Sequence, residues 1–279
     1  MQEAGVVPVG FNRGPWFGRM LSEDGFTLHF ATPSYTSGTK GVQRGHVLAE
    51  PKTRAEFERM KGALKGAWVL ISGESNGWPI DYSPEADEER ALIIEENEKI
   101  SRYNDSVSRI NRENPKKKLE PKELKDVPAL FYKEMRAAGI LGIIQSAKNP
   151  IQALYDRKNI DKMSFETLPE CPDIKLDEHQ YKIIAQKVKE RQYFLLEFDI
   201  RNHFKMGPVK YYNVIGIIRG SEFPDEYVMS GAHLDAFDVA SGGVDDGSGV
   251  APNMEAARLL ALSRPPPRRR TLPTISAAA

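Results

Sequence analysis

Apolar residues along the chain switch between the spacing of β-strands and that of α-helices. Residues 11–50 carry short aromatic and aliphatic runs separated by Gly, Pro, Ser and Thr, which is typical of short strands and turns. Residues 53–65 repeat apolar positions at helical spacing and lead into an apolar strand that ends at Ser72. Residues 131–144 show the same order of helix, glycine and apolar strand. The pattern predicts a layered arrangement of helices and strands.

A charged insertion occupies about residues 84–126, between the two apolar strands. Its acidic start leads into apolar residues accompanied by charge pairs four residues apart. We therefore expect one or two exposed helices here. The run Asn104-Asp-Ser106 fits an N-glycosylation sequon, which has meaning only in a eukaryotic secretory setting.

Three further elements follow the insertion. Asp177 stands three residues before Gln180, and apolar residues follow at helical spacing, so a surface helix is expected to begin there. Residues 193–200 have the pattern of a strong strand. Residues 212–218 predict another strand, which we expect to pair with the strand that leads into His233.

The composition narrows the class of protein. The chain has 279 residues, of which 40% are hydrophobic, enough for a sizeable core. Lys and Arg total 39, as do Asp and Glu, so the formal charge of zero argues against bulk nucleic-acid binding. The single cysteine, Cys171, excludes an internal disulfide. No run is long and apolar enough to cross a membrane, and the first residues lack the pattern of a signal peptide.

The residues that can carry metal chemistry gather in residues 228–249, where one histidine and four acids stand in a glycine-rich window. His233 and Asp235 follow a short apolar strand, at the edge where α/β sheets hold ligands. Because residues two apart in an extended segment point the same way, Asp235 can hold one ring nitrogen of His233 while the other binds a cation. Asp245 precedes a helix that is expected to begin around Ser248, whose dipole favours a carboxylate there.

Three runs in this region resemble the first metal-binding segment of the M28 family of zinc peptidases, the aminopeptidase and glutamate-carboxypeptidase-like group: Ser230–Asp235, Gly243–Gly249 and Met254–Leu260. The resemblance implies hydrolysis of peptide bonds in peptide or protein substrates by two zinc ions that share a hydroxide. It implies that His233 is a terminal ligand of one zinc ion and that Asp245 bridges the two ions. It also implies that Asp235 orients His233.

A second resemblance concerns the layers before this region. The strand up to Ser72, and the helix that ends in Ala-Ala-Gly139 before an Ile-rich strand, resemble the protease-associated domain inserted in many M28 peptidases. The fold class implied is α/β, a partial M28 peptidase sheet with an inserted β-rich α+β protease-associated domain. The limits expected are 1–50 for a β-rich N-terminal segment, 51–205 for the protease-associated-like domain, 206–264 for the start of the peptidase domain and 265–279 for a disordered or out-of-frame tail.

The end of the chain departs from the M28 pattern. The resemblance implies that a Glu-Glu pair holding the general base, a later Asp and a final His lie beyond Arg264. After Leu262 the sequence instead runs through three prolines and three arginines, which predicts neither strand nor helix. We expect a frameshifted or truncated gene, with a natural disordered tail as the alternative. With two of the five expected ligands, the chain as written is expected to hold zinc weakly and to be inactive.

Two other functions stay open from the sequence. The chain can serve as a binding module that contacts peptides or proteins through the protease-associated-like layers. Asp235, Asp238, Asp245 and Asp246 can also form a calcium site, although His233 argues against it because hard cations rarely take imidazole. Asp246 is otherwise expected to point away from the site or to cap the helix. M28 peptidases are frequently exported, but the sequence leaves substrate preference, compartment and oligomeric state undetermined.

Overall fold

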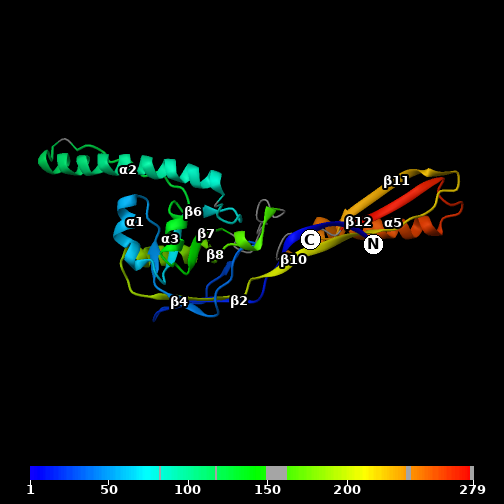
Figure 1. Cartoon of the computed structure of the whole chain (residues 1–279), viewed down its shortest axis with the longest axis horizontal. Coiled ribbons are helices and arrows are strands. Elements are labelled where there is room, and N and C mark those ends of the chain that lie inside the picture. Colours follow the sequence, from blue (N-terminus) through cyan, green and yellow to red (C-terminus); the bar gives the residue numbers. More distant parts are fainter. Residues whose placement is uncertain (82, 117, 149–161, 237–239, 277–279) are drawn as a thin grey trace. The chain divides into compact units, whose positions relative to one another are not determined.

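The computed structural model describes residues 1–81, 83–116, 118–148, 162–236 and 240–276, and the chain divides into two units (Figure 1). The larger unit comprises Arg13–Arg157 and Pro169–His203. The smaller unit comprises Met1–Asn12, Lys158–Leu168 and Phe204–Ala279. The first twelve residues therefore belong with the C-terminal part of the chain and not with the strands that follow them.

The larger unit is built around a five-stranded sheet. Its strands are β3 (Phe30–Ala31), β5 (Val47–Ala49), β6 (Trp68–Ser75), β7 (Gly142–Ala147) and β8 (Asp173–Asp177). Their order is β3-β8-β7-β6-β5. Strands β5, β6, β7 and β8 run parallel to one another, and β3 runs antiparallel to β8. Parallel neighbours need a crossover between them, which explains why helices separate β5 from β6 and β6 from β7 along the chain.

In the part of the larger unit that the structure describes, a second sheet and four α-helices complete the fold. The antiparallel strands β2 (Trp16–Leu21), β9 (Leu195–Ile200) and β4 (Gln43–Gly45) lie side by side in the order β2-β9-β4. The helices are α1 (Arg54–Met60), which continues into a 3-10 turn at Lys61–Ala63, α2 (Pro84–Glu113), α3 (Tyr132–Ala137) and α4 (Glu178–Lys189).

Alternate residues of β6 enter two separate apolar clusters. Trp68 and Leu70 lie in the cluster that contains residues of β9 and α4, whereas Val69 and Ile71 lie in the cluster that contains residues of α1 and α3. The indole nitrogen of Trp68 also donates to the main-chain oxygen of Leu196 at 3.1 Å. Strand β6 is therefore buried on both faces, as expected for a central strand of a parallel sheet.

Local signals in the sequence account for the starts of α1, α2 and α4. Thr53 caps α1, because its hydroxyl accepts a hydrogen bond from the main-chain nitrogen of Glu56 at 3.2 Å. Asp177 caps α4 in the same way. The first part of the charged insertion forms a single helix, α2, which begins at Pro84 after the capping residue Ser83 and ends at Glu113. Among the helices of the described residues, none is long and apolar enough to span a membrane.

The smaller unit contains a four-stranded sheet and helix α5 (Ser248–Leu262), whose start agrees with the sequence. The strands are β1 (Gln2–Asn12), β10 (His203–Ile215), β11 (Phe223–His233) and β12 (Arg269–Ser276). Their order is β1-β10-β12-β11. Because β11 and β12 are parallel and α5 lies between them in the chain, the three elements form a βαβ unit.

Two sequence-based expectations for this sheet are wrong. Strand β12 lies between β10 and β11, so β10 does not pair directly with the strand that leads into His233. The chain after Leu262 was expected to form neither strand nor helix, yet it forms β12. The three consecutive prolines precede this strand, and Pro273 lies outside its pairing with β10, so the missing N–H breaks no bond on that side.

Candidate metal centre

His233 is the last residue of β11 and stands at the carboxyl end of a parallel strand pair. The pairing with β12 runs in register from Val228 to His233. In α/β sheets this edge is where loops hold ligands. The loop that follows passes through Gly242, whose φ of 68° lies in the left-handed region that favours glycine, and it brings Asp245 back to the histidine.

Two carboxylates lie on opposite sides of the imidazole of His233. Its Nδ1 is 3.0 Å from Oδ1 of Asp235 and 3.1 Å from the main-chain oxygen of the same residue. Its Nε2 is 2.9 Å from Oδ1 of Asp245. Because Asp235 accepts the proton on Nδ1, it leaves Nε2 as the nitrogen that can bind a cation in place of its proton.

These contacts also set the charge of the ring. Desolvation by itself lowers the pKa of His233, whereas the main-chain oxygen and carboxylate of Asp235 and the carboxylate of Asp245 raise it, and the pKa lies above its ordinary value. The protonated ring donates from both nitrogens at once. A metal ion at Nε2 therefore takes the place of a proton held between this nitrogen and Asp245.

Asp246 is turned toward the histidine. Its Oδ2 accepts a hydrogen bond from the main-chain nitrogen of His233 at 3.3 Å and lies 4.0 Å from Nε2. The residue that precedes α5 is Gly247, and no side chain caps the helix. The expectation that Asp246 points away or caps the helix is therefore wrong, because this carboxylate satisfies the N–H at the end of β11 instead. The same carboxylate lies close to the start of α5, because a Cβ added at Gly249 would be only 2.3 Å from Oδ1 of Asp246.

The region around this centre matches known peptidases. Residues 213–275 match peptidase family M28. This stretch is similar to an M28 peptidase segment. Carboxypeptidase Q from Rattus norvegicus is 40% identical to the chain over 63 residues, which cover 21% of this chain and 13% of that protein. A probable zinc metalloprotease from Pyrenophora teres f. teres is 39% identical over 66 residues, which cover 21% of this chain and 14% of that protein.

A solved M28 structure shares the fold. The crystal structure of an M28 peptidase precursor from Shewanella amazonensis matches with a TM-score of 0.50 and 17% sequence identity, covering 98% of this chain and 53% of that one. The match confirms the mixed α/β class. The chain spans about half the length of that structure and a much smaller share of the two sequence relatives. The inserted protease-associated domain stays a prediction.

Within the M28 segment, Asn253 links α5 to the strand that carries His233, a role that the sequence patterns did not predict. Asn253 is buried, and its Oδ1 accepts a hydrogen bond from Oγ of Ser230 at 2.6 Å. Ser230 precedes His233 by three residues on β11. A buried polar side chain that is hydrogen-bonded fixes the helix against the strand. The signal that could have found it is a lone amide in the first part of a mostly apolar helix.

The structure brings together His233, Asp235, Asp245 and Asp246, whereas Asp238 lies outside the described residues. Asp235 and Asp245 approach opposite nitrogens of the ring, so their carboxylates do not converge on one point. Accordingly, the part of the chain that is described holds no group of three or more His, Cys, Asp or Glu side chains that could bind one metal ion. The arrangement offers one nitrogen and one oxygen, Nε2 of His233 and Oδ1 of Asp245, to a single ion. Donors of these two kinds suit zinc better than calcium.

Proposed function

We propose that this chain carries part of the metal centre of a zinc-dependent exopeptidase of the M28 type, which hydrolyses peptide bonds in peptide or protein substrates. The observation that supports this proposal most is the approach of His233 Nε2 to Asp245 Oδ1, at 2.9 Å, at the carboxyl end of β11. The names of two relatives, carboxypeptidase Q and a probable zinc metalloprotease, agree with this reaction and this metal.

In this proposal each acid has a separate task. His233 and Asp245 would hold zinc, His233 as a terminal ligand through Nε2 and Asp245 through its carboxylate. Asp235 holds Nδ1 of His233, which orients the ring and raises its basicity. Asp246 holds the main-chain nitrogen of His233 and so fixes the end of the strand. When bound, zinc supplies a Lewis acid that lowers the pKa of a water molecule and polarises a carbonyl oxygen.

The same donor set limits what the chain does alone. Zinc sites in proteins use three or four protein ligands, and within the described residues His233 and Asp245 supply two. We therefore propose that the 279-residue chain binds zinc weakly and does not turn over peptides by itself. A peptidase assay with the purified chain, with and without added zinc, tests this part. Turnover that depends on zinc would contradict it and leave the assignment of the metal centre intact.

Calorimetric titration with zinc tests the ligands themselves. We expect His233→Ala and Asp245→Asn to abolish the measurable binding, and Asp235→Asn to weaken it by about 10–100-fold because it acts through His233. The matched control is His179→Ala, since His179 is an exposed histidine whose Nδ1 lies 3.8 Å from Oδ1 of Asp177. Equal losses for His179→Ala and His233→Ala, or tighter binding of calcium than of zinc, would overturn the proposal.

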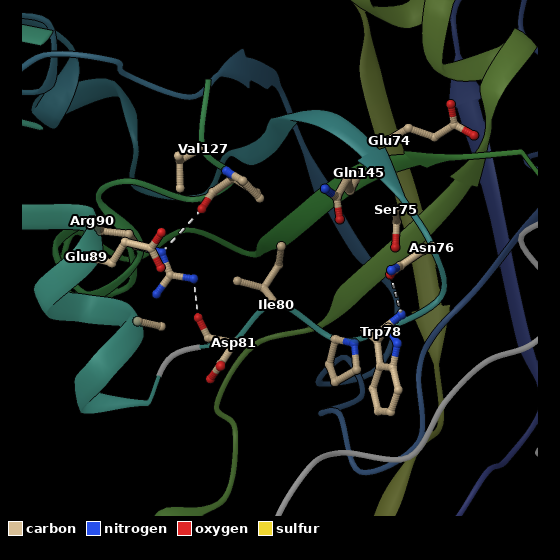
Figure 2. A pocket seen from close by; sticks show the side chains of 13 residues that line it. Glu74, Ser75, Asn76, Trp78, Ile80, Asp81, Glu89, Arg90, Val127 and Gln145 are labelled. Carbon is tan, nitrogen blue, oxygen red and sulfur yellow. Dashed lines mark hydrogen bonds between the residues drawn. The ribbon is translucent and has the colours of Figure 1, made fainter. Parts of the chain in front are cut away.

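A cavity in the larger unit favours a second candidate function, that of a metal-independent peptide-binding module. The cavity has a volume of about 360 Å³ and is lined by polar and apolar side chains, with Trp78 and Gln145 on one part of its wall and Arg90 and Val127 on another (Figure 2). Such a mixed lining is common in ligand sites. Peptide binding that persists in the presence of a chelator and in the His233→Ala variant would support this function. Binding that is lost on chelation would assign it to the metal centre instead.

A further inference from the structure

Helix α2 carries three asparagines seven residues apart, and each holds one residue of a segment that runs back along the helix. Their side-chain Nδ2 atoms donate to main-chain oxygens at 2.8–3.0 Å, and the main-chain nitrogens of the same residues donate to the asparagine Oδ1 atoms at 2.7–2.8 Å. The segment residues are three apart along the chain. The pairs, which we call the rungs of a ladder, are Asn111 with Leu119, Asn104 with Lys122, and Asn97 with Lys125.

The spacing of the ladder matches two helical repeats, that of an α-helix and that of a polyproline II segment. Seven residues of an α-helix advance about 10.5 Å in two turns, which returns the side chain to the same face. Three residues of a polyproline II segment advance about 9.3 Å and also complete one turn. Such a segment has no hydrogen bonds within itself, so its N–H and C=O groups need other partners. An asparagine side chain supplies one acceptor and one donor at each turn.

Arg90, seven residues before Asn97, continues the ladder to Pro128. Its Nε donates to the main-chain oxygen of Pro128 at 3.3 Å. Proline has no N–H, so this rung needs a donor and no acceptor, and arginine has only donors. The guanidinium also donates to the main-chain oxygen of Asp81, as the second dashed line at Arg90 in Figure 2 shows. The ladder therefore ends in the wall of the cavity, which Arg90, Pro128, Val127 and Asp81 help to line.

Burial of the ladder increases toward this inner end. Asn97 is fully buried, whereas the rungs at Asn104 and Asn111 are exposed to solvent. Just beyond the inner rungs, the main-chain nitrogen of Ala129 donates to Oε2 of the buried Glu50 at 2.9 Å. Water can replace the hydrogen bonds of an exposed rung more easily than those of a buried one, so the outer rungs open first.

We propose that residues 119–128 are a strap that controls access to the cavity of the larger unit. The strap opens rung by rung from its outer end, and the cavity wall stays closed until the Asn97 rung is lost. Loss of that rung loosens Val127 and Pro128, which the contacts of the Asp126 carboxylate with Lys52 and Ser72 also help to hold near Arg90. This inference concerns the larger unit alone and does not rest on the metal centre.

Amide hydrogen exchange of the full chain tests the order of opening. Asn111→Ala is expected to speed exchange at Leu119 and to leave Val127 and Ala129 unchanged. Asn97→Ala is expected to speed exchange at Val127 and Ala129 roughly tenfold or more, because a buried side chain loses three hydrogen bonds, two with Lys125 and one with the main-chain oxygen of Lys52. The matched control is Asp105→Ala on the same helix, an exposed position outside the ladder, which is expected to change neither region.

Two results would overturn the strap. Exchange at Ala129 that is as fast in Asn111→Ala as in Asn97→Ala would show that the segment opens as one piece. Unchanged exchange at Val127 and Ala129 in Asn97→Ala would show that the ladder does not hold the cavity wall. If the alanine variant does not fold, Asn97→Leu keeps about the same size and removes the donor and the acceptor without burying a charge. Slow exchange of the amides of β7 and β9 shows that each variant keeps its core.

Discussion

The larger unit buries its central sheet on both faces, whereas the strand that ends at His233 is exposed along most of its length. Trp68 and Phe198 are 0% exposed, and their rings meet edge to face with centroids 4.7 Å apart. On β11, Val228 and Met229 are 50% and 69% exposed. The comparison separates stability from chemistry, because apolar burial stabilises the larger unit while the candidate metal centre stands on a lightly packed sheet.

The largest expected effect is that of a core substitution in the larger unit. Phe198→Ala removes a ring that packs against Phe30 and Trp68, and the lost burial and the cavity left behind are expected to lower the free energy of unfolding by about 4 kcal/mol. Met229→Ala removes an exposed side chain of β11 and is expected to change it by less than about 0.5 kcal/mol. Urea denaturation followed by circular dichroism measures both variants. Similar costs for the two would break the comparison.

A buried ion pair gives the next largest effect. Lys175 is fully buried, with Nζ 2.8 Å from Oδ1 of Asp173 and 3.0 Å from Oε1 of Gln145. Lys175→Met leaves the charge of Asp173 buried without its partner, so the free energy of unfolding is expected to fall by about 3 kcal/mol.

The double variant Lys175→Met with Asp173→Asn removes both charges and serves as the control for this pair. It is expected to recover at least half of the loss, because no unpaired charge stays buried. The measurement is urea denaturation followed by fluorescence, since all three tryptophans lie in the larger unit. A double variant as unstable as the single one would show that lost packing, and not the unpaired charge, sets the cost.

The sequence predicts those parts of the fold that local signals determine. Apolar spacing and capping residues place α1 and α4, because Thr53 and Asp177 act within one turn of the helix start. The place of β12 is not local, since it depends on the crossover through α5 and on pairing with both β10 and β11. The prolines before this strand suggested irregular structure and gave no sign of where the strand would pair.

The candidate metal centre, like the fold, has parts that local signals determine and parts that they do not. The order strand, His-x-Asp, glycine-rich loop and helix is enough to predict that His233, Asp235 and Asp245 meet. The direction of Asp246 could not be predicted, because it depends on how the loop after Gly242 returns to the strand. The ladder on α2 could not be predicted either, because asparagines seven residues apart in a charged helix look like solvent-facing positions. Asn104, the first residue of the sequon, forms the middle one of the three asparagine rungs of this ladder.

A smaller effect is expected for Gly249→Ala in the smaller unit. The new Cβ displaces the carboxylate of Asp246 from the main-chain nitrogen of His233. Alanine otherwise suits a helix better than glycine by up to about 1 kcal/mol, so the net change in the free energy of unfolding is expected to stay below about 1 kcal/mol. Heteronuclear NMR should show shifts confined to the residues around His233. Gly62→Ala is the control, because no atom lies within 4 Å of a Cβ at Gly62, and equal shifts around His233 in both variants would contradict the contact.

Ionisation of the Cys171 thiol is expected to have the smallest effect on stability near neutral pH. The reactivity of this thiol reports on the packing of the larger unit. Burial raises the pKa of the thiol to about 11, and its Sγ lies 3.5 Å from the hydroxyl oxygen of Tyr132. Because the thiolate is the reactive form, native chain is expected to react with a disulfide reagent at pH 8 at least about 100-fold more slowly than unfolded chain.

The raised pKa of the Cys171 thiol also makes the stability of the larger unit depend on pH, and the direction of this dependence can be worked out. In the unfolded chain Cys171 ionises near its ordinary pKa of 9.0, whereas in the folded chain it does so near 11, so stability is unaffected below pH 9 and is lost as the pH rises from 9 to 11. Cys171→Ala is expected to remove this loss. Labelling at pH 8 is expected to be faster in Phe198→Ala and unchanged in Met229→Ala, because only the first loosens the unit that buries the thiol. Faster labelling in Met229→Ala would mean that the exposed face of β11 contributes to the packing of the larger unit, and the separation of stability from chemistry would fail.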